Sequence, residues 1–429
     1  MAKPPAPSNR SKKSTSSDTI AAVATPPGRG GLGVVRVSGP LVPPIAEAVL
    51  GQLPQPRYAT YGPFQDGAGE TLDNGIALFF PAPRSYTGED VLELHAHGSP
   101  VVLDRLVERI VALGARLARP GEYTERAYMN GKLALAQAEA VADLIDSSTV
   151  AAARSAIRSL QGELSQRVSS IVEAIKDQRT HMEAAIDFPD EGIETSVICR
   201  HRARLKAVLA DTERLLGEAY QGQVLSQGLR IAIAGPPNVG KSSLLNRLAR
   251  AERAIVTDVP GTTRDAIQVE IDLNGLRIEL TDTAGLRDTA DPVEQEGIRK
   301  TERVLGEVDH VLYVRDHLNA SEAFVRDPGY PPYTLVHNKI DLSGREPALR
   351  RENGCTEVFL SARTGAGLDL LTRHLKQVAG LTEGSGAFAA RRRHVEALRR
   401  AGQALREGLH ALVHGVGLEL VAEDLRRAQ

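Results

Sequence analysis

The sequence contains few cysteines, and this scarcity excludes two kinds of protein. The two that are present, Cys199 and Cys355, lie far apart along the chain. They provide neither a disulfide framework nor a closely spaced pair of thiolate ligands for a metal ion. We interpret both as structural thiols in a reducing compartment.

Long apolar stretches are also lacking. No apolar run is long enough to form a transmembrane helix. Residues 1–17 are rich in Pro, Ser and Lys and lack the apolar core of a secretory signal, so we expect a disordered tail. These absences together predict a cytoplasmic protein without a membrane segment.

An overall excess of basic residues is absent as well. The chain has 52 Lys and Arg residues against 54 Asp and Glu residues, a formal net charge of −2. Bulk charge therefore gives no sign of nucleic-acid binding, and any RNA site has to be a local patch. Arg391, Arg392 and Arg393 form the one basic cluster that merits a test, and a solvated helix face is the simpler interpretation of it.

The chain does have the length and composition of a multidomain globular protein. Its 429 residues, 42% of them hydrophobic and 25% charged, suggest two to four domains. Strand patterns at 33–38 and 75–80 and a helical pattern at 101–113, with Gly114 as its stop, predict an α+β N-terminal domain over residues 18–131.

Apolar residues at helical spacing predict all-α regions on both sides of a central segment. One helix face is predicted from Ile157, Leu160, Leu164, Val168, Ile171 and Ile175. The same spacing continues after a break at residues 188–190, in Leu205, Leu209 and Leu216, and returns near the C-terminus in Val395, Leu398, Leu405, Leu409 and Leu412. We therefore expect one helical domain, residues 132–228 plus 381–429, with a GTPase domain inserted at 229–380.

The start of the inserted segment matches a phosphate-binding motif. A strand pattern at 230–234 is followed by GPPNVGKS at 235–242 and then by a helical pattern at 243–248, which is the context that the motif G-x-x-x-x-G-K-S requires. The glycines allow backbone N–H groups to surround phosphate oxygens at a helix N-terminus. Lys241 offers a positive charge to the β- and γ-phosphates, and the Ser242 hydroxyl suits Mg²⁺. The motif predicts an α/β P-loop domain of the Ras-like kind.

Further motifs follow in the order that GTP hydrolysis requires. The sequence GTTRD at 261–265 offers a hydroxyl to Mg²⁺, for which Thr263 is our choice. A strand pattern at 278–281 leads to DTAG at 282–285, where Asp282 suits the water shell of Mg²⁺ and the Gly285 N–H suits the γ-phosphate. Strand patterns at 333–336 and 358–360 lead to NKID at 338–341 and to SAR at 361–363.

Asn338 and Asp341 are predicted to select the base. A carboxylate at Asp341 can accept hydrogen bonds from both the ring N–H and the exocyclic NH₂ of guanine. Adenine has neither donor there, and an unpaired buried carboxylate costs on the order of 10⁴–10⁵ in discrimination. The Ala362 N–H would meet the guanine carbonyl. Most short motifs are weak alone, but their order along the chain indicates a guanine-specific GTPase.

The residues alone do not identify the group that orients the attacking water. Many GTPases place a glutamine directly after the sequence DTAG, but this chain has Leu286, which cannot orient water. Asp288, Asp291, Glu294 and Glu296 are alternatives among which spacing does not choose.

No arginine finger is identifiable either. The Asn238 carboxamide oxygen, near the phosphates, could help hold a monovalent cation in place of the finger. A hydrogen bond that stabilises the loop is an equally plain interpretation of this residue.

The chain resembles the tRNA modification GTPase MnmE family, also called TrmE, over nearly its whole ordered length. The resemblance extends beyond the GTPase motifs, which many proteins share. It is carried by DTIAAVATPPGRGG at 18–31, YTGEDVLE at 86–93, RPGEY at 119–123, NGK at 130–132, AIDFPDE at 185–191 and ARRRH at 390–394.

The resemblance implies roles for residues that spacing did not assign. Glu294 is expected to orient the attacking water, with Lys241 as the other catalytic residue. A K⁺ ion is expected to replace the arginine finger, held by Asn238, Thr257, Val259 and Thr262, and hydrolysis would then depend on K⁺ and on dimerisation of the GTPase domains. The expected GTP-binding residues are Asn238, Val239, Gly240, Lys241, Ser242, Ser243, Thr257, Asp258, Val259, Pro260, Gly261, Thr262, Thr263, Asp282, Thr283, Ala284, Gly285, Asn338, Lys339, Asp341, Ser361, Ala362 and Arg363.

The resemblance also implies a second site and a reaction. The N-terminal domain is expected to form a constitutive homodimer and to bind formyl-tetrahydrofolate, a one-carbon donor, through Arg36, Glu93 and Lys132. The implied reaction adds a carboxymethylaminomethyl or aminomethyl group to the wobble uridine of tRNA. An FAD-dependent MnmG or GidA partner, expected in a heterotetramer, would supply the redox chemistry.

This chain departs from the family pattern at one point. Family members usually continue past the helix that here ends at residues 425–429 and finish in a Cys-Ile-Gly-Lys tail, which neither Cys199 nor Cys355 matches. GTP hydrolysis is expected to survive this difference, because none of its residues is missing.

Three alternative functions remain open from the sequence. A ribosome-assembly GTPase would usually carry an RNA-binding appendage such as a KH module, and no convincing one is found. A nucleotide-driven scaffold would show no measurable turnover. A folate-dependent transferase with a regulatory GTPase domain would need no partner protein.

Overall fold

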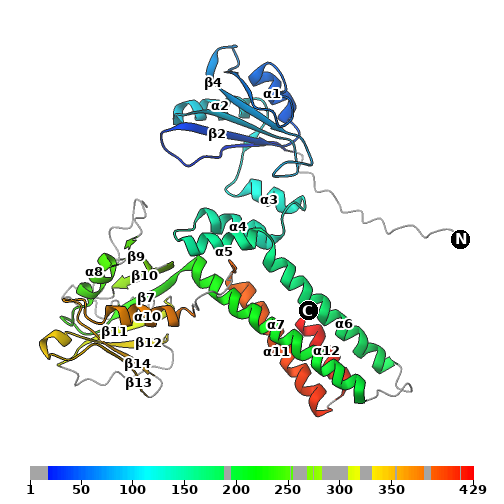
Figure 1. Ribbon diagram of the computed structural model, residues 1–429. Coiled ribbons are helices and arrows are strands. Elements are labelled where there is room, and N and C mark those ends of the chain that lie inside the picture. Colours follow the sequence, from blue (N-terminus) through cyan, green and yellow to red (C-terminus); the bar gives the residue numbers. More distant parts are fainter. Residues whose placement is uncertain are drawn as a thin grey trace, which may run out of the picture. The chain divides into compact units, whose positions relative to one another are not determined.

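The computed structural model describes residues 18–187, 195–251, 253–254, 268–273, 275–282, 308–318, 331–352, 355–380, 388–415 and 417–429. The chain forms two compact units, Met1–Val141 and Ala142–Gln429 (Figure 1). An α+β domain, a helical domain and an inserted α/β GTPase domain are all present, which confirms the predicted fold class. Within the described ranges, no helix combines the length and the apolarity needed to cross a membrane.

The first unit is built on a six-stranded sheet in the order β3-β4-β5-β2-β1-β6. Neighbouring strands are antiparallel except β1 and β6, which are parallel. The strands predicted at 33–38 and 75–80 are confirmed within β2 and β4. The strand bounds are β1 Ile20–Val23, β2 Gly30–Ser38, β3 Thr60–Gln65, β4 Thr71–Phe80, β5 Val91–Gly98 and β6 Arg116–Leu117.

Two helices, α1 Val42–Leu50 and α2 Pro100–Ala112, pack their apolar side chains against one face of this sheet. Because side chains alternate along a strand, Val35 and Leu94 join that core, whereas Arg36 and Glu93 belong to the opposite face. Gly114, at φ +103°, follows α2 closely, as predicted. A third helix, α3 Glu122–Met129, comes next.

The helical part of the second unit has a core formed by four helices, α6, α7, α11 and α12. Ile175, Leu205, Leu405 and Leu425 are nearly fully buried in it, one from each helix. The C-terminal leucine pattern therefore forms core, as predicted. Helix α4, Leu135–Ile145, contains the boundary between the two units. The helices after it are α5 Val150–Leu160, α6 Glu163–Asp187, α7 Thr195–Gln227, α11 Arg392–His414 and α12 Leu418–Ala428.

The prediction of one helix face from Ile157 to Ile175 is wrong. Gly162, at φ +84°, ends the α-helical path between α5 and α6, so the stripe is divided between two helices. Ile157 is half exposed, whereas Ile175 is fully buried. Cys199, which we interpreted as a structural thiol, is exposed. The predicted break at residues 188–190 lies outside the described residues.

The GTPase domain is an eight-stranded sheet in the order β13-β14-β12-β11-β7-β10-β9-β8. The pairs β10–β7, β7–β11, β11–β12 and β12–β14 are parallel, and the outer pairs are antiparallel. The strands are β7 Leu229–Ala234, β8 Arg253–Ala254, β9 Gln268–Leu273, β10 Leu276–Asp282, β11 His310–Asp316, β12 Tyr333–Asn338, β13 Ala348–Glu352 and β14 Cys355–Phe359.

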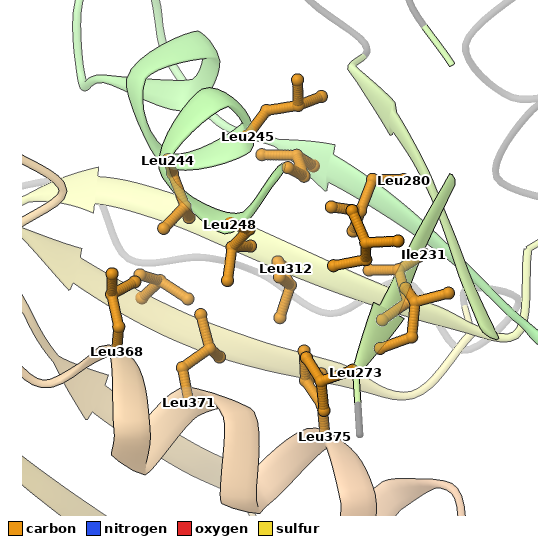
Figure 2. Packing of buried hydrophobic residues seen from close by; sticks show 14 of the residues in the cluster. Ile231, Leu244, Leu245, Leu248, Leu273, Leu280, Leu312, Leu368, Leu371 and Leu375 are labelled. Carbon is orange, nitrogen blue, oxygen red and sulfur yellow. The ribbon is translucent and has the colours of Figure 1, made fainter. Parts of the chain in front are cut away.

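Two helices, α8 Lys241–Ala251 and α10 Leu368–Val378, share one apolar core with this sheet. Figure 2 shows Leu248 of α8 and Leu371 of α10 in the same cluster as Ile231 of β7 and Leu312 of β11. All four side chains are essentially fully buried. This core fixes β7 and α8, and therefore the loop that joins them.

The chain re-enters the helical domain through a buried segment at residues 388–390. Phe388 is fully buried, and the Arg158 guanidinium lies 4.6 Å from its ring centroid. The Ser159 hydroxyl and the Ser155 carbonyl both hydrogen-bond to the Ala389 backbone. The second connection of the inserted domain is thus held firmly against α5.

Candidate nucleotide site

The carboxyl ends of the parallel strands place the GTPase motifs at one edge of the sheet. β7 lies between β10 and β11, so the strand order reverses there, which is where open α/β sheets bind ligands. The loop after β7 carries residues 235–240 and leads directly into α8. The neighbouring strands β10, β11 and β12 end at Asp282, Asp316 and Asn338.

Two glycines allow the loop after β7 to pass close to the adjoining strands. Gly235 has φ +140°, and a Cβ there would stand 2.0 Å from the Val314 carbonyl oxygen of β11. Gly240 has φ +95°, and its Cβ would stand 2.5 Å from the Asn338 side-chain nitrogen. Any other residue would force the loop away from the strand ends.

Lys241 is buried and folds back over the loop that precedes it. Its Nζ donates hydrogen bonds to the carbonyl oxygens of Gly235, at 3.0 Å, and Pro236, at 2.7 Å. Ser242 and Ser243 follow it in the first turn of α8, where the helix dipole favours an anion. The loop and helix therefore present positive electrostatic potential at the strand edge, which suits phosphate groups.

Asn338 joins the phosphate-binding loop to the loop after β14. Its side-chain nitrogen donates to the Val239 carbonyl oxygen at 2.8 Å, and its side-chain oxygen accepts from the Ala362 N–H at 2.9 Å. The side chain is 3% exposed, so both bonds are shielded from water. A guanine oxygen would have to share the Ala362 N–H or displace Asn338 from it.

Asp341 presents its carboxylate beside that junction. Oδ1 accepts from the Ser361 hydroxyl at 2.6 Å, and Oδ2 pairs with the Arg363 guanidinium at 2.7 Å. The Ser361 hydrogen bond and the Arg363 charge lower the pKa of Asp341, so the carboxylate stays ionised. The exposed Arg363 guanidinium therefore occupies the place beside Asp341 that the N–H donors of guanine would take.

Asp316 and Arg247 also support this site and were not expected from the sequence. Lys339 adopts the left-handed conformation, at φ +67°, and its Nζ pairs with Asp316 at 2.9 Å. Arg247 of α8 donates to the Arg363 carbonyl oxygen at 3.0 Å. Neither Asp316 nor Arg247 lies in a recognisable motif. The strand that ends at Asp316 was not predicted either, so the sequence offered no signal for these two residues.

Eleven of the predicted site residues lie outside the described residues. They are Thr257, Asp258, Val259, Pro260, Gly261, Thr262, Thr263, Thr283, Ala284, Gly285 and Glu294. The same is true of Leu286 and of the alternative acids Asp288, Asp291 and Glu296. For Asp282 the backbone alone is described, as the last residue of β10.

The first unit brings together two of the three residues predicted to bind folate. Arg36 of β2 and Glu93 of β5 are directly paired in the sheet register. The Arg36 Nε donates to Glu93 Oε1 at 2.8 Å, and the side chains are 28% and 17% exposed. A partly buried ion pair on an open sheet face can bind a polar heterocycle through both charges.

Aromatic rings flank this pair, which sequence reasoning did not foresee. The Arg36 guanidinium lies 5.7 Å from the Tyr86 ring centroid and 5.6 Å from that of Tyr123, and His95 Nε2 lies 3.4 Å from Glu93. Lys132 donates to the Pro83 carbonyl oxygen at 3.1 Å, in the same 81–90 segment that carries Tyr86.

The arginine cluster near the C-terminus is largely paired with acids. Arg391 contacts Asp143 at 3.2 Å, and the exposed Arg392 contacts Glu396 at 2.7 Å. Both contacts are the kind expected of a solvated helix end.

Two family models match the chain. Residues 135–429 match the model described as MnmE helical domain, and residues 19–132 match the model described as GTP-binding protein TrmE N-terminus. Together they cover nearly all of the described residues.

Individual relatives are similar over almost their whole length. The tRNA modification GTPase MnmE of Sodalis glossinidius (strain morsitans) is 52% identical over 423 residues, which are 96% of this chain and 93% of the relative. The same-named protein of Yersinia pseudotuberculosis serotype O:1b (strain IP 31758) is 51% identical over 97% of this chain and 94% of its own. Among solved structures, the G domain of the T. maritima FeoB iron transporter is 26% identical, covers 35% of this chain and 98% of that one, and has a TM-score of 0.26.

Proposed function

This chain belongs to the MnmE family of tRNA modification GTPases, and on that premise we propose that its GTP hydrolysis depends on K⁺ and drives modification of the wobble uridine of tRNA. The chain is a GTP hydrolase that acts in tRNA modification. We further propose that formyl-tetrahydrofolate is the one-carbon donor. In this proposal the protein is a homodimer that works in the cytoplasm with an FAD-dependent MnmG-type protein.

The contact between Asn338 and the phosphate-binding loop carries the nucleotide part of the proposal. It fixes the base-recognition strand end and the phosphate loop relative to each other through a buried 2.8 Å hydrogen bond. Asp341, ionised beside them, can accept the two N–H donors that guanine has and adenine lacks. One GTP molecule can therefore contact the loop through its phosphates and Asp341 through its base.

Residues of α8 would stabilise the charge on the phosphates. Lys241 already directs its Nζ over the loop, and a phosphate oxygen would replace its present carbonyl partners. Mg²⁺, when held by Ser242 and the predicted ligand Thr263, would neutralise charge on the β- and γ-phosphates. Ser242 lies in the first turn of α8, the position that such a ligand requires.

Asn238 supports the K⁺ part of the proposal. It is exposed in the phosphate-binding loop and adopts the left-handed conformation, at φ +61°. Among the residues that the structure describes, its carboxamide has no hydrogen-bond partner, which does not favour a loop-stabilising role. A carboxamide oxygen at this position can help hold a cation that stabilises charge in the transition state. We assign the orientation of the attacking water to Glu294.

The Arg36–Glu93 pair supports formyl-tetrahydrofolate as the one-carbon donor. Glu93 can accept hydrogen bonds from the amino and ring N–H groups of a pterin, and Tyr86 and Tyr123 offer ring faces beside it. Lys132 can pair with a carboxylate of the folate tail, whereas Arg36, which pairs with Glu93 at 2.8 Å, lies at the end of the site that would hold the pterin.

Reconstitution tests the reaction directly. Purified chain, an MnmG-type partner, undermodified tRNA, GTP, K⁺ and formyl-tetrahydrofolate are combined, and nucleosides are analysed by mass spectrometry. We expect a modified wobble uridine only when the folate and both proteins are present. Unmodified uridine in the complete mixture, with GTP hydrolysed normally, would contradict the transfer part of the proposal.

A further inference from the structure

Gly275 lies in the short connection between strands β9 and β10. β9 and β10 pair in antiparallel register from Leu273–Leu276 outward, so the loop between them is very short. Gly275 has φ +96°, and its N–H donates to Asp272 Oδ1 at 2.6 Å. A glycine is required here because other residues rarely adopt this conformation. Gly275 is thus tied directly to β9 through Asp272.

Through Gly275 the β9–β10 hairpin contacts helix α5 within the same compact unit. The Thr149 hydroxyl donates to the Gly275 carbonyl oxygen at 3.0 Å and accepts from the Ala152 N–H at 3.1 Å. A single hydroxyl thus caps the N-terminus of α5 and binds the hairpin. Thr149 is 5% exposed, and a Cβ on Gly275 would stand 3.2 Å from the Ala151 methyl group.

A second contact holds the same hairpin against the end of α7. Gly228 joins α7 to β7 at φ +77°, and a Cβ there would stand 2.9 Å from the Arg277 carbonyl oxygen of β10. The Arg277 side chain pairs with Glu270 across the hairpin. Near its tip the hairpin is therefore held by two helices of the helical domain, α5 and α7.

The other end of the hairpin belongs to the nucleotide site. β10 ends at Asp282, which the motif places near Mg²⁺, and β9 follows the segment that holds Thr257 and Thr263. β10 spans about 20 Å at roughly 3.3 Å per residue. A paired strand transmits displacement along its axis because its ladder hydrogen bonds resist slippage by single residues.

We propose that Thr149 is a positioning residue that couples the nucleotide state of the GTPase domain to helix α5 through Gly275. The inference rests on the proposed assignment of Asp282 to the nucleotide site. Nucleotide binding at one end of β10 changes the strength of the Thr149–Gly275 contact at the other. The N-terminus of α5 then responds, because the same hydroxyl caps it.

Hydrogen exchange of the full-length protein tests this coupling. Peptides covering α5 are compared by mass spectrometry without nucleotide and with GDP plus aluminium fluoride in KCl. In the unaltered protein we expect nucleotide to change the exchange rate of the first-turn amides at least three-fold. In Thr149→Val the change falls below two-fold, and Thr149→Ser, which keeps the hydroxyl, restores it.

Two controls separate coupling from simple destabilisation. Thr212→Val removes another fully buried threonine hydroxyl, which bonds to Val208 within α7, and is expected to keep the nucleotide response of α5. Binding of a fluorescent GDP analogue is measured for every variant and should agree within two-fold. An α5 response of normal size in Thr149→Val, or none in the unaltered protein with nucleotide bound, overturns the coupling. Failure of the unaltered protein to bind nucleotide overturns the proposed nucleotide site instead.

Discussion

The Asn338 side chain donates a 2.8 Å hydrogen bond to the Val239 carbonyl oxygen, so a residue of the base-recognition motif supports the phosphate-binding loop directly. The same carboxamide accepts from the Ala362 N–H. The segments that we propose to recognise the base and the phosphates are therefore structurally linked in this domain.

Replacing Asn338 should cost both affinity and stability. Asn338→Ala leaves the buried Val239 carbonyl and Ala362 N–H without partners, which should lower the free energy of unfolding of the domain by roughly 2–4 kcal/mol. Binding of a fluorescent GDP analogue should weaken at least a hundred-fold. The exposed Asn238 of the same chain is the matched control, because Asn238→Ala should leave stability unchanged. Equal stability losses in the two variants would contradict the bridging role.

Asp341 should determine the choice of base. Asp341→Asn replaces an acceptor by a carboxamide that can donate, which mismatches the guanine NH₂ and matches the second carbonyl of xanthine. We expect GTP affinity to fall on the order of 10³-fold and xanthosine triphosphate to become the preferred ligand in competition binding. Asp316→Asn, which alters the partner of Lys339 instead, should retain the preference for guanine. Unchanged preference in Asp341→Asn would show that the carboxylate does not contact the base.

The buried His310 should make the GTPase domain less stable in mild acid. Burial, and the nearby His374, lower the pKa of His310 to about 4, below the 6.5 expected in the unfolded chain. The unfolded state therefore binds the proton first, so the contribution is complete above pH 6.5 and is lost as the pH falls toward 4. Between pH 7.5 and 5 this one group should cost roughly 1–2 kcal/mol.

The variant His310→Gln tests that sign. Its loss of stability between pH 7.5 and 5 should be smaller by the amount attributed to His310, as measured by urea unfolding with pulse labelling of β11 and β12 peptides. His410→Gln, at an exposed histidine of α11, controls for the substitution itself. If the variant loses as much stability as the unaltered protein, His310 does not cause the destabilisation in acid.

Glu93 should be required for folate and not for nucleotide. Glu93→Gln keeps the shape of the side chain but removes the charge that pairs with Arg36, and it offers a donor where a pterin needs an acceptor. Calorimetric titration with formyl-tetrahydrofolate should show at least a thirty-fold loss of affinity with unchanged GTP turnover. Glu125→Gln, at an exposed partner of Arg119, is the control. Folate affinity equal to that of the unaltered protein would move the folate site elsewhere.

Contiguous motifs made much of the GTPase domain predictable. Residues 235–242 and 338–341 specify a loop and a strand end by local chemistry, and the strand patterns before them are confirmed as β7 and β12. The structure further shows that Gly235 and Gly240 are needed for close approach to β11 and Asn338. Local sequence therefore sufficed where the backbone conformation of a short contiguous segment defines the feature.

Contacts between distant segments could not be predicted in the same way. The Lys339–Asp316, Arg247–Arg363 and Thr149–Gly275 pairs join residues on different elements, and no spacing rule connects them. The helix break at Gly162 was missed because apolar spacing continues through it, while the backbone there turns to positive φ. Periodicity reports which residues are apolar, and it does not report where a helix ends.

GTP turnover in KCl against NaCl at equal ionic strength tests the central claim most directly. We expect K⁺ to accelerate hydrolysis at least ten-fold, and we expect Asn238→Ala to abolish the acceleration while nucleotide affinity is retained. Glu294→Ala should abolish hydrolysis with either cation. A slow rate that is the same in both salts would contradict the cation mechanism and indicate that this GTPase is activated by another protein.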